Sequence, residues 1–364
     1  MNKKRGRLDT LRISWLFLAV AAVALSGCPS NDYGIDDCSA AGAPPVPDYW
    51  AGPGVTDVTF LAFGDSQVYL DSSLTENDGG RKNDLHVQAL NVADTLRWNA
   101  LGVDQPVARI RGVLMTGDIT QNGRDARETP ANEYGVFAAD YGLCGNRILR
   151  FPMFEGYGNH DFRSWNNLLY GNEHPVADSV SVRNPYRVGL TNQAPGKAGH
   201  YSWDWDGIHF INLNLCPSDI VPVVPDAPVG TRDPRLALTY LVDDLAAVGT
   251  GRPVVIMHHY YPHAATFEWD QAQIDAYASA ISGYQVIAIL HGHSHGTGTG
   301  TWQGIPIFNL GSPFYLSYNP DGRGHYSVFR ITNDRLYAFD VSWDPTNPAS
   351  IVGPDDWSRA VDLP

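Results

Sequence analysis

The sequence predicts an α/β protein with mixed β-sheets. Short apolar runs rich in β-branched and aromatic residues alternate along the chain with segments of helical apolar spacing. Such runs are typical of strands buried on both faces, and helical spacing is typical of amphipathic helices that cover a sheet. The expected core strands are residues 58–63, 112–116, 252–257 and 285–290.

The segments between these strands complete the expected α/β pattern. Apolar residues recur at helical spacing in residues 85–100, 238–248 and 274–281, which predicts three helices. Residues 200–215 and 326–343 have the pattern of longer antiparallel strands around a turn. Helices and strands that alternate in this way are typical of one layered α/β domain.

Composition excludes some classes of partner. The chain has 364 residues, of which 43% are hydrophobic and 18% are charged, as in folded globular proteins. It has 25 Lys and Arg against 39 Asp and Glu, a net charge of −14. This balance argues against the backbone of a nucleic acid or an anionic membrane surface as the main partner. We therefore expect no nucleic-acid partner.

The N-terminus has the pattern of an export signal. Residues 1–12 carry five basic residues and one acidic residue, and residues 13–25 are an apolar run. That run is shorter than the roughly 20 residues a membrane-spanning helix needs. The sequence Leu25-Ser26-Gly27-Cys28 that follows resembles the lipobox of bacterial lipoproteins, which implies lipid attachment at Cys28. An ordinary signal peptide is the alternative, and both interpretations take the chain out of the cytosol.

These observations divide the chain into four parts. Residues 1–27 are expected to be a lipoprotein signal peptide, and residues 28–54, rich in Pro and Gly, a tether. Residues 55–343 are expected to form the folded domain and residues 344–364 a poorly packed tail. The chain would then lie in the cell envelope, attached to the membrane at Cys28, in the periplasm or on the cell surface.

Three further cysteines would lie in a compartment that permits disulfides. Cys144 with Cys216 is the favoured pair because Cys38 lies in the expected tether, although the sequence leaves the pairing open. Their spacing is not that of a metal pair.

Polar residues follow the predicted core strands at the point where each strand ends. Because carboxyl ends of strands share one rim of an α/β sheet, these residues would converge on one cleft. Each signal alone is weak, since an Asp after a strand is commonly a cap or turn residue and a buried His is commonly hydrogen-bonded in the core. Together they favour a metal site in this cleft, formed at the strand ends Gly64-Asp65-Ser66-Gln67, Gly117-Asp118, Gly158-Asn159-His160-Asp161, His258-His259 and His291-Gly292-His293-Ser294-His295.

Taken in order, these motifs resemble the five blocks of the calcineurin-like metallophosphoesterases, over roughly residues 58–312. The resemblance implies a four-layer αββα sandwich of two mixed β-sheets flanked by helices, with two divalent metal ions at the strand ends. It places one ion on Asp65, Gln67, Asp118 and His295. It places the other on Asp118, Asn159, His258 and His293, so that the Asp118 carboxylate bridges both.

These ligand types suit Mn, Fe, Zn or Mg better than soft metals. A shared carboxylate can hold two ions about 3.5–4 Å apart, and water between them loses its proton near neutral pH. We therefore expect a metal-dependent hydrolase of phosphate esters, a phosphomonoesterase or a phosphodiesterase. Its substrate would be a small phosphate ester or a lipid head group.

Two residues beside the expected ligands are candidate catalytic groups. The resemblance implies that His160 steadies the phosphoryl oxygens or protonates the leaving group. Asp161 could orient the His160 imidazole, or it could be a helix cap. His259 is expected to point to the opposite face from His258 and to support the ligands from outside.

Two positions depart from related patterns. The commonest first block has His where this chain has Gln67, and the same Gln occurs in the ADP-ribose/CDP-alcohol diphosphatase branch. Gln121 stands where a purple acid phosphatase would need Tyr, so we expect no Fe(III)–tyrosinate. The alternatives are a nucleotide–alcohol diphosphatase and a surface metal-binding lipoprotein without turnover.

Overall fold

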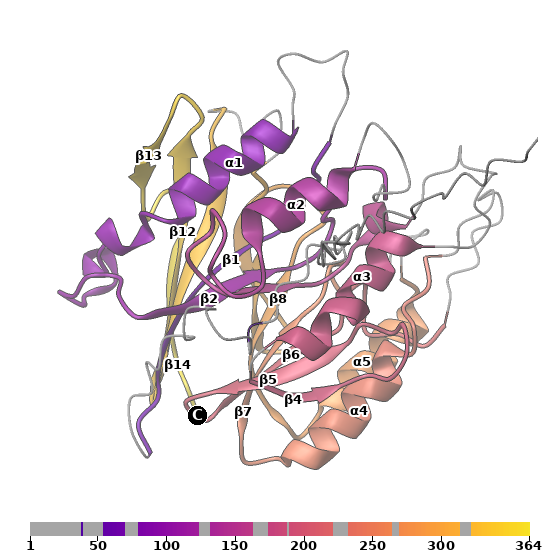
Figure 1. Cartoon of the computed structure of the whole chain (residues 1–364). Coiled ribbons are helices and arrows are strands. Elements are labelled where there is room, and N and C mark those ends of the chain that lie inside the picture. Colours follow the sequence, from indigo (N-terminus) through magenta and orange to yellow (C-terminus); the bar gives the residue numbers. More distant parts are fainter. Residues whose placement is uncertain are drawn as a thin grey trace, which may run out of the picture. The chain divides into compact units, whose positions relative to one another are not determined.

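Two mixed β-sheets of seven strands each form the centre of the fold (Figure 1). The computed structural model describes residues 38, 54–69, 79–123, 132–162, 174–187, 189–220, 232–263, 269–313 and 322–364. The described residues belong to one unit, residues 32–364. The expected signal peptide, the lipidation site Cys28 and most of the tether lie outside the described residues.

The first sheet has the strand order β13-β12-β11-β1-β2-β3, with β14 also paired to β12. Its strands β1 to β3 are parallel, and β1 pairs with β11 in the antiparallel direction. The strands are β1 (Asp57–Phe63), β2 (Ile110–Met115), β3 (Met153–Glu155), β11 (Gly324–Thr332), β12 (Arg335–Asp344), β13 (Asn347–Val352) and β14 (Ser358–Asp362).

The second sheet has the order β4-β5-β6-β7-β8-β10-β9, and the strands from β6 through β7 and β8 to β10 are parallel. Its strands are β4 (Leu190–Gln193), β5 (Tyr201–Trp205), β6 (Ile208–Asn212), β7 (Pro253–Met257), β8 (Gln285–His291), β9 (Gly298–Trp302) and β10 (Ile305–Asn309). Both sheets therefore present carboxyl ends of parallel strands.

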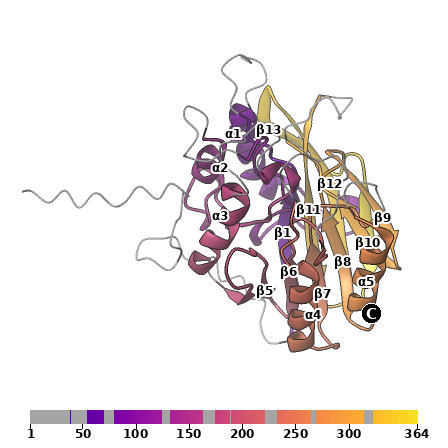
Figure 2. The same cartoon turned by 90° about the vertical axis from the view of Figure 1, so that its right-hand side faces the viewer.

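Helices cover the outer faces of the sheets, with α1 and α2 on one side of the strands and α4 and α5 on the other (Figure 2). Phe63 of β1 contacts His86 of α1 and Tyr141 of α2, and His209 of β6 contacts Asp244 of α4. The helices are α1 (Gly79–Leu90), α2 (Glu133–Tyr141), α3 (Pro175–Arg183), α4 (Ala237–Val248) and α5 (Gln271–Ile281), with 3₁₀ turns η1 (Ala93–Thr95), η2 (Asn99–Leu101), η3 (Asn159–Asp161) and η4 (Asn184–Tyr186). The expected α/β class with two mixed sheets is confirmed.

Aromatic rings fill the space between the two sheets. Phe60 of β1 meets Phe210 of β6 with ring centroids 5.5 Å apart. Phe154 of β3 stacks on Trp203 of β5 at 4.4 Å, and Phe308 of β10 meets Phe329 of β11 at 5.0 Å. Because large apolar side chains on both sheets interlock, the sheets keep a fixed position relative to each other.

The predicted helices α4 and α5 form over nearly the expected residues, but the helical pattern of residues 85–100 is interrupted. Helix α1 ends at Leu90. The side chain of the next residue, Asn91, donates to the Ile148 carbonyl and accepts from the Arg150 N–H. These bonds to a distant loop compete with continuation of the helix.

The C-terminal residues are part of the fold, so the expected poorly packed tail is wrong. Strands β13 and β14 both pair with β12, and Trp357 between them packs against Phe308 at 5.6 Å. The Trp357 indole donates to Thr297 in a 2.7 Å hydrogen bond, and Arg359 donates to the Gly300 carbonyl. Proline misled the prediction because it is tolerated in edge strands such as β13. The segment joins one sheet to the other.

The favoured disulfide is also wrong, since Cys38 pairs with Cys144. Cys216 is buried after β6 and is not part of this disulfide. Cys144 lies between α2 and β3, beside the first sheet, and the backbone N–H of Cys38 donates to Tyr186. Although Cys38 lies in a segment of tether-like composition, the disulfide attaches this residue to the domain. Among the described residues, no helix has both the length and the apolar character needed to cross a lipid bilayer.

The C-terminal contact between sheets makes a prediction about stability. Trp357→Ala removes a ring packed on Phe308 and leaves Thr297 without its indole donor, so we expect the free energy of unfolding to fall by about 2–3 kcal/mol. Val352→Ala in β13, whose side chain is 46% exposed, is the matched control and should change it by less than about 0.5 kcal/mol. Urea unfolding measures both variants. Equal effects would show that this segment does not join the sheets.

Candidate metal centre

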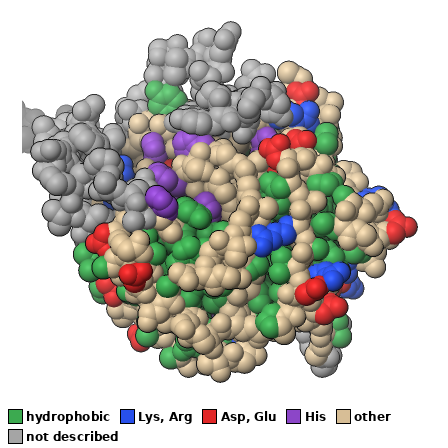
Figure 3. Space-filling view, turned by 180° about the vertical axis from the view of Figure 1, so that it is seen from behind, with side chains coloured by type: hydrophobic (Ala, Val, Ile, Leu, Met, Phe, Trp, Pro, Cys, Tyr) green, Lys and Arg blue, Asp and Glu red, His purple; other side chains and the backbone are tan. Residues whose placement is uncertain are grey.

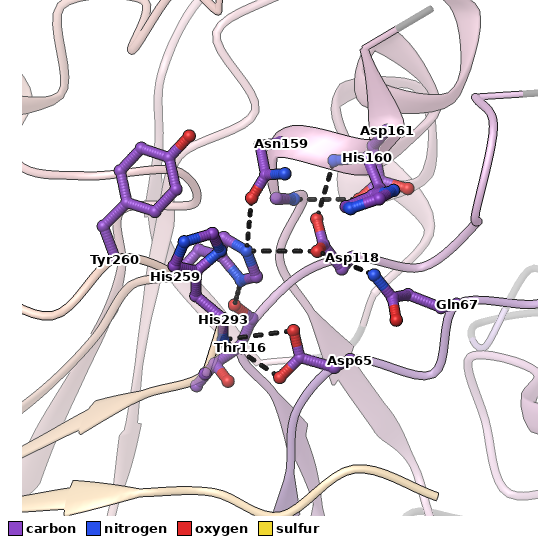
Figure 4. A network of polar contacts seen from close by, with 12 residues as sticks. Asp65, Gln67, Thr116, Asp118, Asn159, His160, Asp161, His259, Tyr260 and His293 are labelled. Atoms are coloured by element: carbon purple, nitrogen blue, oxygen red, sulfur yellow. Dashed lines mark hydrogen bonds and ion pairs between the residues drawn. The ribbon is translucent and has the colours of Figure 1, made fainter. Parts of the chain in front are cut away.

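The carboxyl ends of five strands bring the candidate ligands together, as the sequence predicts. Asp65 follows β1, Asp118 follows β2, and Asn159 lies after β3. His259 follows β7, and His293 and His295 follow β8; Figure 4 shows the side chains of most of them directed toward one another. Figure 3 shows that histidine side chains also gather in one region of the surface.

Two groups of ligand atoms share Asp118. In one group, single ligand atoms of Asp118, His259 and His293 all lie within 4.8 Å of one another. In the other, the same is true of Asp65, Asp118 and His295. A carboxylate common to two such groups is the arrangement by which one side chain can bridge two ions.

The hydrogen bonds of His259 determine which of its ring nitrogens faces the first group. Its Nδ1 lies 2.9 Å from the Thr116 carbonyl oxygen, which can only accept, so Nδ1 carries the hydrogen of the neutral ring. The unprotonated Nε2 then faces the Asn159 Oδ1 at 2.9 Å and the Asp118 Oδ2 at 3.3 Å. Three electron-donating atoms therefore converge, and a divalent ion fits them.

The second group offers mainly oxygen. The Gln67 Oε1 is buried and has no hydrogen-bond partner, while the Gln67 Nε2 donates to the Asp118 Oδ2 at 3.3 Å. The His295 Nε2 lies 3.7 Å from the Asp65 Oδ1. A buried amide oxygen left without a partner is costly unless something compensates for it, and a cation between these residues would do so.

The backbone at the site is held in an unfavourable conformation. Five candidate ligands have left-handed φ angles: Asp65 (55°), Gln67 (35°), Asp118 (55°), His293 (73°) and His295 (60°). Such angles cost non-glycine residues of order 1–3 kcal/mol each and are concentrated at functional sites. They persist here because the loops are tied together, for example by the His293 N–H, which donates to both carboxylate oxygens of Asp65.

One glycine allows the loops after β2 and β3 to approach each other. A Cβ atom on Gly158 would lie 2.2 Å from the Asp118 Oδ1 and 2.5 Å from the Asp118 backbone nitrogen. Only glycine fits there, so Gly158 is needed to bring Asn159 beside the shared carboxylate.

Burial and mutual charge control the protonation of the site. Burial raises the pKa of Asp65 well above its usual range, and the negative charge of Asp118 raises it further. Burial also raises the pKa of Asp118, but His259 and His160 beside it outweigh this effect and hold the pKa below its usual range. Burial lowers the pKa of His295 to about 4, so this ring is neutral and able to bind a metal at pH 7.

The structure corrects one predicted ligand, because His259 and not His258 faces the other ligands. His258 lies against the rings of Trp269 and Tyr277 at 5.8 and 5.5 Å, and both of its buried ring nitrogens lack a hydrogen-bond partner. Neighbouring residues at the end of a strand point to opposite faces, as expected for this pair, but the alternation does not tell which of them faces the site.

For Asp161 the structure supports the helix-cap alternative and not the orienting role. Its carboxylate accepts from the backbone N–H groups of Gly158, Ile119 and Thr120 at 2.8–3.0 Å, so it caps η3 and ties the loop after β2 to the loop after β3. The expected orienting role belongs instead to the Gln121 carbonyl, which lies 2.8 Å from the His160 Nδ1. Sequence patterns gave no sign of this, because a backbone carbonyl belongs to every residue.

His160 lies beside Asp118. Its backbone N–H donates to the Asp118 Oδ1 at 2.8 Å. Since the Gln121 carbonyl takes the Nδ1 hydrogen, the Nε2 of the neutral ring can accept a proton, and that of the protonated ring can donate one.

Comparison with known proteins identifies the family. The sequence of residues 83–297 matches that of the calcineurin-like phosphoesterases, and the chain belongs to this family. The matched segment holds the site residues from Asp118 to His295. Asp65 and Gln67 precede it and are placed by the structure. No curated protein matches the chain in sequence.

Solved structures share the fold. A dimetal phosphatase from Danio rerio is 14% identical, with a TM-score of 0.50 over 84% of this chain and 99% of that chain. GAP50, described as the anchor in the inner membrane complex of Plasmodium, is 10% identical, with a TM-score of 0.52 over 85% of this chain and 90% of that chain. At these identities the likeness concerns the fold alone.

The reversal of the two histidines is testable with a matched pair of variants. His259→Phe removes a nitrogen that faces Asp118 and Asn159, so we expect the affinity for one of two Mn²⁺ ions to fall by more than about 10- to 100-fold. His258→Phe replaces a ring that already packs among aromatic residues and should leave both ions bound. Titration calorimetry with Mn²⁺ measures both variants. Loss of an ion in His258→Phe alone would show that His258, and not His259, is the metal ligand.

Proposed function

We propose that this calcineurin-like phosphoesterase hydrolyses phosphate esters at a dinuclear metal centre. The observation that carries the proposal is the buried Asp118 carboxylate, which belongs to both groups of ligand atoms. The family supports a metal-dependent phosphoester hydrolase, and the ligand types favour Mn, Fe, Zn or Mg.

In this proposal one ion is held by Asp65, Gln67, Asp118 and His295, and the other by Asp118, Asn159, His259 and His293. When bound, two such ions supply a water-derived nucleophile at neutral pH and neutralise charge on the phosphoryl oxygens. The remaining chemistry falls to the protein side chains.

His160 is the proposed proton donor to the leaving group. The Gln121 carbonyl fixes its ring by accepting from Nδ1, which leaves Nε2 as the site of proton exchange. The His160 backbone N–H donates to the Asp118 Oδ1 at 2.8 Å, which holds the residue beside the shared carboxylate. The ring can therefore deliver a proton to an alkoxide or phosphate as it leaves.

A metal-binding protein without turnover is the second candidate. Its support is Gln67, whose neutral amide oxygen is a weaker ligand than the imidazole common at this position. Likeness to an anchor protein such as GAP50 does not decide between the two, because the fold alone is shared. The decision therefore requires a measurement of activity.

The proposed reaction can be tested with the full chain purified in detergent. We expect hydrolysis of p-nitrophenyl phosphate or bis(p-nitrophenyl) phosphate with Mn²⁺, Zn²⁺ or Mg²⁺, and none after a chelator. Asp118→Asn weakens both ligand groups and should abolish turnover. His160→Ala should lower kcat by about 10²- to 10⁴-fold while both ions stay bound.

The ratio of the two substrates distinguishes a monoesterase from a diesterase. Two bound ions without turnover of these compounds or of nucleotide diphosphate esters would favour the binding protein. Turnover that survives the chelator would contradict the metal mechanism.

We also propose that the chain is exported and anchored by a lipid on Cys28. The basic residues 1–12, the apolar residues 13–25 and the Leu25–Cys28 sequence support this proposal. The disulfide between Cys38 and Cys144 adds independent support, because disulfides persist in oxidising compartments outside the cytosol.

Metabolic labelling tests the anchor. The wild-type chain expressed in a bacterium should incorporate labelled palmitate and remain with the membrane fraction, whereas Cys28→Ser should lose the label. Cys216→Ser, which changes a cysteine outside the disulfide, is the control and should keep it. Label retained by Cys28→Ser, or absent from the wild type, would refute the proposal.

A further inference from the structure

A partly buried arginine lies beside the candidate metal centre without an acidic partner. Arg232 precedes α4, and its guanidinium donates to the Tyr260 hydroxyl at 3.4 Å. Among the described residues, no carboxylate lies within ion-pair distance of it. A partly buried guanidinium without a carboxylate partner keeps its positive charge available, and a bound anion would neutralise it.

Tyr260 connects this arginine to the metal centre. Its ring packs edge-on against the ring of His293, with centroids 4.8 Å apart, and it follows His259 in the chain. Figure 4 shows Tyr260 beside both histidines, with its hydroxyl directed away from Asp65. Arg232 is therefore separated from a proposed metal ligand by one aromatic ring and one hydrogen bond.

The backbone that carries Arg232 is fixed by its neighbours. The Asp233 carboxylate accepts from the Arg235 N–H at 2.7 Å, and the Arg235 carbonyl lies 3.1 Å from the His200 Nε2. The Arg235 side chain pairs with Asp178 at 2.8 Å, so its own charge is neutralised. Of these two arginines, Arg232 is the one whose charge remains available to a ligand.

We propose that Arg232, held by Tyr260, binds the second phosphate of a diphosphate ester whose first phosphate lies at the metal centre. This proposal rests on the proposed function and specifies its substrate class. The Tyr260 ring contacts His293 and its hydroxyl contacts Arg232, so the arginine suits a group attached to the scissile phosphate rather than that phosphate itself. Guanidinium and phosphate are well matched in charge and geometry.

The reaction is then hydrolysis of the bridging P–O–P bond. The oxygen of water forms a bond to the first phosphorus, and the bond from that phosphorus to the bridging oxygen breaks. The electron pair stays on the second phosphate, and the water protons are shared between the two products, which are both phosphomonoesters. Arg232 stabilises the negative charge that develops on the leaving phosphate.

The test compares two substrates and four proteins, all as the full chain loaded with Mn²⁺. Arg232→Met should lower kcat/KM for diadenosine diphosphate by about 10- to 100-fold, which is the effect expected when a charge-assisted hydrogen bond is lost. The kcat/KM for p-nitrophenyl phosphate should change little. Arg232→Lys should recover part of the loss. Arg252→Met is the matched control, since Arg252 pairs with Asp204 at the opposite end of β7 and should behave as wild type.

Binding gives a second readout that does not depend on turnover. Methylenediphosphonate should bind the wild type more tightly than inorganic phosphate does in calorimetry, and Arg232→Met should remove that difference. An equal loss of kcat/KM on both substrates in Arg232→Met would overturn the inference. So would an unchanged preference of this variant for methylenediphosphonate. If the wild type hydrolyses nothing, the proposed function fails and calorimetry alone decides whether Arg232 binds a second phosphate.

Discussion

The burial of Asp118 is the constraint on which the site depends. A carboxylate removed from water is costly unless other groups compensate its charge. Here the His160 N–H donates to one oxygen, while Gln67 donates to the other and His259 lies beside it. These partners come from loops after β1, β3 and β7, so one side chain determines how both sheets meet at the site.

The strained loops require a rigid support, and the structure provides it behind β3. Glu155, the last residue of β3, forms fully buried ion pairs with Arg183 and Arg187 at 3.1 and 2.5 Å. The guanidinium of Arg187 also donates to the Met153 carbonyl. Losing one member would leave the others with uncompensated buried charge, so the cluster holds the strand that leads to Asn159 and His160 in one position.

The sequence predicted the features that follow from hydrophobic periodicity and from the order of the motifs. It failed where the outcome depends on tertiary contacts. Buried strands and the polar residues that end them follow from local patterns, which is why Asp65, Asp118 and Asn159 could be placed in advance. Whether His258 or His259 faces the site depends on how β7 sits between β6 and β8. The partners of Cys38 and Asp161 lie on remote segments, and no local pattern specifies them.

The two proposed metal positions differ in chemistry, and Gln67 is the cause. Its amide carries a donor and an acceptor on the same carbon, so Nε2 can donate to Asp118 while the buried Oε1, which has no hydrogen-bond partner, can bind a cation. With the proposed ligands, one position would have two carboxylates, an amide oxygen and one imidazole, whereas the other would have one carboxylate, an amide oxygen and two imidazoles. Oxygen-rich sites favour harder ions such as Mn²⁺ or Mg²⁺, and imidazole-rich sites suit Zn²⁺ or Fe²⁺. Because Asp118 belongs to both groups of ligand atoms, a change of ion at one position would alter the charge that its carboxylate presents to the other.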